Sequence, residues 1–180
     1  MKNALYKWLL MVFALHALSA CTGIPKGLEA VPAINPDRYL GTWYEIARLD
    51  HSFERGLEKV TATYTANPDG SIKVINTGYD PEKKKWKSAE GKAIFIDDVN
   101  KDQTRTGRLK VSFFGPFYSS YNIIDLDIEH YQYAVVCGPN KSYFWILSRV
   151  STLDKKKLDQ LVQKAKNLGF KTDLLIYVKH

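Results

Sequence analysis

The sequence predicts an all-β fold, an eight-stranded up-and-down antiparallel barrel with one C-terminal α-helix packed outside it. From residue 39 onward, short runs of Val, Ile, Tyr, Phe and Thr recur about every dozen residues. Mostly short connections rich in turn-forming residues separate them, as at Pro68-Asp69-Gly70 and Gly138-Pro139-Asn140. Short links favour pairing of consecutive strands and therefore a barrel. A two-sheet sandwich is the alternative, because periodicity alone does not show closure.

Composition agrees with one globular domain. The chain has 180 residues, of which 45% are apolar and 25% charged, enough for a core that needs neither metal nor disulfides. These proportions exclude disordered chains, collagen-like repeats and multi-span membrane proteins. The formal charge of +7 fits an anionic partner or a solvated basic surface. Two cysteines are too few for a disulfide framework.

Residues 1–20 are predicted to be a signal peptide. Lys2 and Lys7 precede an apolar run over 8–20, which at 13 residues is shorter than the roughly 20 that span a bilayer. The segment that ends this run, Leu18-Ser19-Ala20-Cys21, resembles the bacterial lipobox. An ordinary signal peptide followed by a chance cysteine is the alternative. Export argues against a nucleic-acid partner.

The lipobox resemblance implies that Cys21 is acylated and becomes the first residue of the exported chain. Three acyl chains suffice for stable membrane anchoring. Thr22 follows, where an aspartate would favour the inner membrane, so the resemblance implies the outer membrane with the barrel facing the periplasm. Residues 21–36 contain three prolines and are predicted to be a lipid-anchored tether and lead-in.

Period-two runs rich in β-branched and aromatic residues define the expected strands in chain order. The strands are expected at 41–48, 60–66, 72–79, 85–93 or a little beyond, 108–113, 121–127, 131–137 and 143–148. Residues 97–107 form a long polar connection.

A helix is expected after the eighth strand. Apolar residues at 158, 161, 162, 165 and 168 share one helical stripe, Ser151 with Asp154 fits its start, and Gly169 fits its end. The lysines at 155–157, 164 and 166 are interpreted as its solvated side, with a lipid-headgroup patch as the alternative. A final extended segment is expected at 174–178.

Two motifs carry a resemblance to the lipocalins. Gly41-Thr42-Trp43 is similar to the Gly-x-Trp motif of the first lipocalin strand, and Trp145-Ile146-Leu147-Ser148-Arg149 to the run ending in arginine that closes the eighth. The resemblance implies that Gly41, Trp43 and Arg149 form the closed base of the barrel, with the arginine across the indole. A cation over a tryptophan face is favourable.

The amino-acid sequence of three further segments resembles the bacterial outer-membrane lipocalins in particular. These segments are residues 41–48, 56–64 and 111–117, and the resemblance runs over roughly 36–178. It implies a barrel domain at 37–180 that binds fatty acids or lysophospholipids. A two-chain phospholipid would overfill a small barrel.

Strand parity gives candidate ligand-binding residues. Because side chains alternate across a strand, Glu45 and Ala47 are expected on the side of Trp43, and Tyr143 and Trp145 on the side of Arg149. The other candidates are Val111, Phe113 and Tyr133, on strands of less certain phase. Such walls suit an acyl chain with a polar head. The alternative is that these aromatics fill the barrel as core.

No catalytic motif is recognised in the sequence, and neither a metal nor a cofactor is expected. Cys137 is interpreted as a buried inert thiol, with a reactive thiol as the alternative. The sequence therefore predicts a lipid-binding outer-membrane lipoprotein that stores or transports its ligand in the cell envelope. The alternatives are a structural or envelope-stress lipoprotein with a filled barrel, which could dimerise through Phe114 and Phe117, and a lipid-modifying enzyme.

Overall fold

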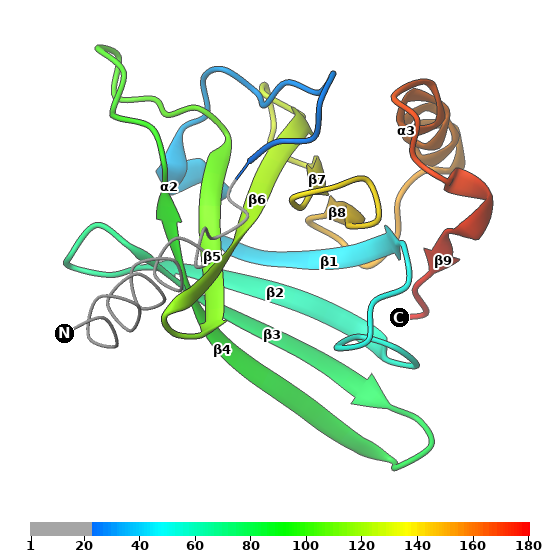
Figure 1. Ribbon diagram of the computed structural model, residues 1–180. Coiled ribbons are helices and arrows are strands. Elements are labelled where there is room, and N and C mark those ends of the chain that lie inside the picture. The colour runs from blue at the N-terminus through cyan, green and yellow to red at the C-terminus, as the bar shows by residue number, and fades with distance from the viewer. Residues whose placement is uncertain (1–22) are drawn as a thin grey trace, which may run out of the picture.

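A computed structural model describes residues 23–180 as a closed antiparallel barrel (Figure 1). The predicted signal peptide and Cys21 lie outside the described residues. Each strand pairs with the next along the chain, and β1 pairs with both β2 and β8, which closes the barrel and excludes a two-sheet sandwich. The eight strands are β1 (Gly41–Arg48), β2 (Glu58–Ala66), β3 (Ile72–Asp80), β4 (Lys85–Phe95), β5 (Arg108–Phe114), β6 (Phe117–Leu126), β7 (Tyr133–Cys137) and β8 (Phe144–Ser148).

A ninth short strand extends the sheet beside β1. The first half of β1 pairs with β2, and where β2 diverges, β9 (Ile176–Tyr177) pairs with Ala47 and Arg48. The backbone N–H of Lys59 donates to the carbonyl of Lys179 at 2.6 Å, so the C-terminal segment bridges β1 and β2.

The expected strand bounds agree closely with the structure except at β6. This strand begins at Phe117, four residues earlier than expected, because Phe117 pairs with Phe114 across the tight Gly115-Pro116 turn. The two serines at 119 and 120 weaken the apolar alternation there, so the pairing with β5, and not local composition, extends the strand.

In the described part of the chain, two α-helices flank the barrel. The short α2 (Pro36–Tyr39), which the sequence pattern did not predict, starts at an Asn35 side chain that accepts from the N–H of Arg38. The predicted C-terminal helix is α3 (Lys155–Asn167), capped by the Asp154 carboxylate. Gly169 follows with a φ of 83°, a left-handed conformation that ends helices and favours glycine.

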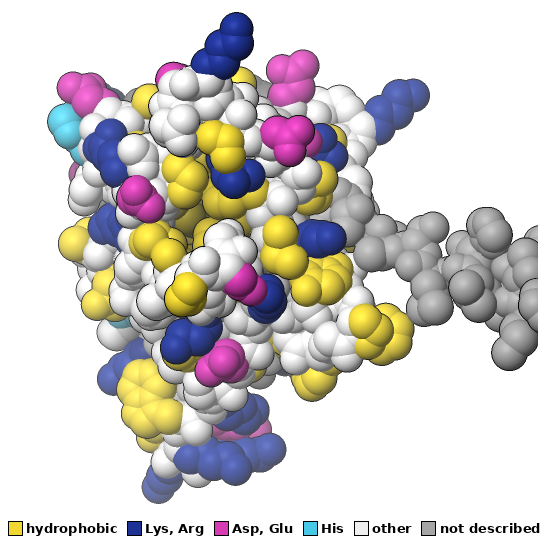
Figure 2. Space-filling model, turned by 90° about the vertical axis from the view of Figure 1, so that its left-hand side faces the viewer, with side chains coloured by type: hydrophobic (Ala, Val, Ile, Leu, Met, Phe, Trp, Pro, Cys, Tyr) yellow, Lys and Arg dark blue, Asp and Glu magenta, His cyan; other side chains and the backbone are white. Residues whose placement is uncertain are grey.

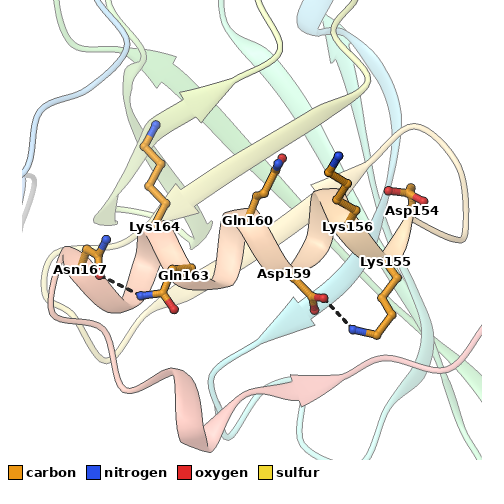
Figure 3. Close-up of a pocket in the computed structure, with 8 residues that line it drawn as sticks. All are labelled: Asp154, Lys155, Lys156, Asp159, Gln160, Gln163, Lys164 and Asn167. Carbon is orange, nitrogen blue, oxygen red and sulfur yellow. Dashed lines mark hydrogen bonds and ion pairs between the residues drawn. The ribbon is translucent and has the colours of Figure 1, made fainter.

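The outer side of α3 is polar (Figure 3). Lys155 pairs with Asp159 at 2.6 Å, and Gln163 donates to Asn167 at 2.9 Å. A one-turn helix, η1 (Thr172–Leu174), then leads to β9. Two lysines of the helix reach the barrel wall instead: Lys164 pairs with Asp125 of β6 at 2.8 Å, and the Lys157 ammonium lies 4.8 Å from the ring centroid of Tyr133.

Two apolar cores result from this arrangement. One fills the interior of the barrel and contains Trp43, Val74 and Leu109. The other lies between the outer barrel wall and α3, where Phe144 packs against Phe170 with ring centroids 4.6 Å apart. Because both faces of β7 and β8 are buried, these strands lack polar alternation.

The residues that lead into the barrel also pack against it. Val31 donates to the carbonyl of Ile123 at 2.9 Å, and Ile34, which is fully buried, exchanges backbone hydrogen bonds with Arg105. Leu28 joins the core beneath α3. Most of the described part of the 21–36 segment therefore belongs to the folded unit. Within 23–180, no helix is long and apolar enough to cross a membrane.

Candidate functional site

The closed end of the barrel is built around Trp43 and Arg149. The guanidinium carbon of Arg149 lies 3.8 Å from the centroid of the Trp43 indole. Its nitrogens donate to the backbone carbonyls of Thr42, Arg38 and Tyr131 at 3.0, 2.6 and 3.3 Å. Four contacts therefore hold one charged side chain across the base.

Gly41 begins β1 beside this arginine with a φ of 92°. A side chain is strained in that conformation, and a Cβ there would lie 3.4 Å from Nη1 of Arg149. The glycine of the Gly-x-Trp motif therefore adopts the backbone conformation needed at the start of the strand. Its lack of a side chain leaves room for the guanidinium of Arg149.

Three tyrosines lie above the base. The phenol oxygen of Tyr121 is 2.7 Å from that of Tyr39 and 2.9 Å from that of Tyr64. Burial raises the pKa of all three phenols, so they are neutral and can bond one another. At the closed end of the interior, these three tyrosine hydroxyls are therefore hydrogen-bonded to one another.

Three of the predicted ligand-binding residues line the inner wall further up. Val111 and Phe113 of β5 and Trp145 of β8 all pack against the barrel-interior core. Gly91 of β4 faces Phe113, and a Cβ there would come within 2.8 Å of its ring. Although these three side chains point inward, they remain partly exposed to solvent. The barrel interior is therefore not completely covered at these three side chains.

Tyr133, another predicted ligand-binding residue, lies outside the barrel, and its prediction was wrong. It packs into the core beneath α3, under Lys157, while its neighbours Ala134 and Val136 face the interior. Both faces of β7 are buried, so apolar character did not reveal which face points inward.

Glu45 points inward as predicted by parity and pairs with an arginine that parity missed. The Arg48 Nη1 donates to Oε1 of Glu45 at 2.6 Å, and both side chains are buried. A β-bulge between Glu45 and Ala47 shifts the alternation, which turns Arg48 inward and Ala47 outward against α3. The expectation that Ala47 shares the side of Trp43 was therefore wrong.

The β1–β2 connection, residues 49–57, folds over the open end and is tied to the inner wall. Arg48 Nη2 donates to the carbonyls of Glu54 and Leu57 at 2.9 and 3.3 Å. The indole N–H of Trp145 donates to Oε2 of Glu54 at 3.0 Å. One arginine and one tryptophan from the wall thus fix the position of this connection.

Tyr143, also predicted to bind ligand, lies at this end on the β7–β8 connection. Its ring stacks on His51 with centroids 4.8 Å apart and an angle of 5° between planes. His51 also stacks on Phe53 and tilts against Trp145. These rings bury His51, a single histidine on a loop.

Burial shifts the pKa values of Glu45, Glu54 and His51 at the open end. Burial, with the charge of Glu54 beside it, raises the pKa of Glu45 to about 8, against the opposing ion pair with Arg48. Burial also raises the pKa of Glu54, against its hydrogen bond with Trp145. The pKa of His51 falls to about 4 through burial and the charge of Arg48, so the imidazole is neutral at pH 7.

An apolar wall with a charged group near its open end can hold an amphiphilic molecule, with its apolar part toward the tyrosines. Sequence reasoning missed Arg48, Glu54 and the tyrosine cluster of 39, 64 and 121. The one available signal was the set of charged residues flanking the predicted first connection. It did not show that a bulge would turn Arg48 inward.

The described chain offers few groups for other chemistry. No cluster of three or more His, Cys, Asp or Glu side chains that could hold a metal is found from residue 23 onward. Cys137 is buried beneath α3, and burial raises its thiol pKa to about 12.

Comparison with known families identifies relatives of this barrel. The lipocalin-like domain family matches residues 34–180. The outer membrane lipoprotein Blc of Vibrio cholerae is 51% identical over 162 residues, covering 90% of this chain and 92% of the relative. The protein of the same name from Citrobacter freundii is 53% identical over 155 residues, covering 86% of this chain and 84% of the relative.

Solved structures show the same architecture. Insecticyanin from the tobacco hornworm Manduca sexta superposes with a TM-score of 0.68, covering 88% of this chain and 87% of its own, at 19% identity. At that identity the likeness concerns the fold alone.

Proposed function

The chain belongs to the lipocalin family, and from that premise we propose that it is a lipid-binding lipoprotein of the outer membrane. Its ligand is a fatty acid or a lysophospholipid, whose acyl chain is buried inside the barrel. Two relatives that are about 50% identical to this chain over most of their length are named outer membrane lipoproteins. Reversible burial of the chain is worth roughly 0.8 kcal/mol per CH₂ and needs neither a catalytic group nor a cofactor.

The observation that carries the ligand proposal is the partial exposure of inward-facing apolar side chains. Val111, Phe113 and Trp145 would be fully covered in a filled barrel. The tyrosine hydroxyls below them bond one another, so an acyl chain entering this region leaves none of these three hydroxyls without a partner.

The buried charged residues Glu45, Arg48 and Glu54 support placing the lipid headgroup near the open end. Arg48 provides a fixed positive charge there, and the raised pKa values of Glu45 and Glu54 lessen the negative charge that an anionic headgroup meets. A carboxylate or phosphate therefore lies more favourably at this end than against the tyrosines.

A tryptophan-fluorescence titration tests the ligand. The chain from residue 22 onward, delipidated, is titrated with a fatty acid or a lysophospholipid below its micellar concentration. We expect a saturable change near one ligand per chain that Trp145→Phe abolishes and that Trp86→Phe, the same change outside the barrel, retains. A flat response, or one lost only in Trp86→Phe, would contradict the proposal and favour a filled barrel.

We also infer that residues 1–20 are removed as a signal peptide and that Cys21 is acylated, so that the anchor directly precedes the packed lead-in and the barrel faces the periplasm. Cys21→Ser should release the protein from the outer-membrane fraction and abolish incorporation of labelled palmitate. Unchanged fractionation and labelling would favour an anchor elsewhere. A homodimer through Phe114 and Phe117 stays a prediction that sedimentation velocity can check.

A further inference from the structure

The up-and-down topology places alternate connections at opposite ends of the barrel. The connections after β2, β4 and β6 lie at the closed end with Trp43 and Arg149. Those after β1, β3, β5 and β7 surround the open end. The two ends can therefore be compared residue by residue.

Exposed aromatic side chains gather at the open end. Within the described chain, Phe53, Trp86, Phe114 and Phe117 are 60, 60, 82 and 64% exposed, and they occupy or adjoin three of its four connections. We call these four residues the aromatic rim. Exposed large apolar residues on the connections of the closed end are aliphatic: Ile96, Val99 and Ile128. Tryptophan is enriched at membrane–water interfaces, and phenylalanine is typical of the apolar face of helices that lie in the interface.

Charge is also divided between the two ends. The closed-end connections carry six acidic residues, Asp69, Asp97, Asp98, Asp102, Asp127 and Glu129, and two basic ones, Lys101 and Arg105. The open-end connections carry three acidic residues, Asp50, Glu54 and Glu82, and four basic ones, Arg55, Lys83, Lys84 and Lys141. The closed-end connections are therefore net acidic, and those of the open end are slightly basic.

The β3–β4 hairpin combines both features. It projects from the barrel (Figure 1), and in Figure 2 the lowest part of the molecule carries basic side chains around hydrophobic ones. At its tip, Lys83, Lys84 and Lys85 precede Trp86, whose ring lies 5.6 Å from that of Tyr79. An amphipathic ring flanked by lysines suits the headgroup region of an anionic bilayer, where each lysine contributes about 1 kcal/mol.

We propose that the aromatic rim docks on the surface of an anionic phospholipid bilayer, so that the open end of the barrel faces the membrane. A flat partner fits four aromatic residues spread over separate connections better than a groove-binding peptide does. Docking would let a single-chain lipid pass between bilayer and barrel without crossing bulk water.

The start of the described chain agrees with this orientation, a step that rests on the proposed acylation of Cys21. Asn122 Nδ2 donates to the carbonyls of both Gly23 and Gly138, at 3.4 and 3.3 Å. Gly138 opens the β7–β8 connection, so Gly23 lies beside the open end. Two residues reach about 7 Å at most. An anchor at Cys21 would therefore hold this end close to the bilayer.

Vesicle binding by the chain from residue 22 onward tests docking without the anchor. This chain retains both described cores and all nine strands. We expect co-sedimentation with vesicles of phosphatidylcholine and phosphatidylglycerol at 7:3, and much weaker binding to phosphatidylcholine alone. The triple variant Trp86→Ser, Phe114→Ser, Phe117→Ser should bind at least tenfold more weakly. The matched closed-end variant Val99→Ser, Ile128→Ser, Val150→Ser should bind as wild type does.

A second pair of variants tests the charges. Lys83→Gln, Lys84→Gln, Lys85→Gln should weaken binding to the anionic vesicles severalfold, whereas Lys155→Gln, Lys156→Gln, Lys166→Gln on α3 should not. Equal loss in both sets would mean attraction by overall charge and would overturn the proposal, as would unchanged binding by the rim variant. A rim variant that only converts a dimer to a monomer in sedimentation velocity would assign the rim to a second copy.

Ligand titration of the same variants separates this proposal from the proposed function. A rim variant that still takes up fatty acid but no longer binds vesicles supports docking. Vesicle binding by a wild-type protein that takes up no lipid would instead refute the ligand proposal and leave the docking surface standing.

Discussion

The guanidinium of Arg149, which follows β8, is held 3.8 Å from the ring centroid of Trp43 in β1 by three backbone carbonyls. These contacts join the start of β1, the helix α2 and the loop before β7 at one point. The closed end therefore depends on a single side chain with a planar, multidentate head.

Arg149→Lys should destabilise the barrel by about 1–3 kcal/mol. A lysine keeps the charge but cannot donate to three carbonyls while it covers the indole. Urea unfolding followed by tryptophan fluorescence measures the loss, with Lys166→Arg on the solvated side of α3 as the control. An unchanged midpoint would mean that the carbonyls are satisfied without the guanidinium.

The contribution of Glu45 to stability should fall as pH rises from about 4.5 to about 8. The folded state raises the pKa of Glu45 to about 8, so the folded protein holds this proton more tightly than the unfolded chain does. This contribution is full below pH 4.5 and is lost progressively up to the folded pKa, at about 1.4 kcal/mol for each pKa unit. Below pH 6.5 the lowered pKa of His51 gives the opposite slope, so the net decline should appear between pH 6.5 and 8. Unfolding free energies at pH 6.5, 7, 7.5 and 8 measure this decline.

Glu45→Gln provides the matched test of this slope. The amide stays neutral and its oxygen can still accept from Arg48, so the decline between pH 6.5 and 8 should flatten. The exposed Glu129→Gln should leave the slope as in wild type. The assignment fails if the Glu45→Gln protein loses stability with pH as steeply as the parent.

Removing the central hydroxyl of the tyrosine cluster should cost about 2 kcal/mol. Tyr121→Phe leaves two buried phenols, Tyr39 and Tyr64, without the oxygen that each contacts at 2.7 and 2.9 Å. Thermal unfolding by circular dichroism gives the change, and the exposed Tyr177→Phe serves as the comparison. Equal midpoints for both variants would show that the phenols find other partners.

Truncating the buried face of α3 should destabilise the fold by about 2–5 kcal/mol. Leu161 is buried in the core beneath the helix, and Leu161→Ala leaves a cavity between helix and barrel wall. Gln160→Ala, one residue earlier on the exposed side, should be neutral. Chemical unfolding of both proteins tests the difference; a neutral Leu161→Ala would mean that the helix contributes little to the barrel.

Much of the fold could be predicted because local signals and tertiary structure agree. Alternating β-branched and aromatic residues gave the strands, and the spacing of Leu158, Leu161 and Leu168 gave α3. Trp43 and Arg149 could be paired because their motifs resemble those of the lipocalins, and that resemblance implies the contact. The short α2 was missed because four residues carry too little periodicity to be recognised.

The interior was harder to predict, for two physical reasons. The bulge after Glu45 depends on the register between β1 and β8, which no single residue reveals, so Arg48 was missed. In β7 both faces are buried, one in the barrel and one under α3, so Tyr133 was assigned to the wrong face. The alternation of side chains along a strand shows which residues face the barrel interior only where one face of the strand is polar.

Cys137 lies fully buried between β7 and α3, and burial raises its pKa to about 12. At neutral pH almost none of it is thiolate, the form that reacts with electrophilic reagents. The barrel therefore supplies a silent background for site-directed labelling. In the chain from residue 22 onward, a fluorophore or spin label attached through a cysteine introduced at the open end would report on that position alone, without first removing Cys137.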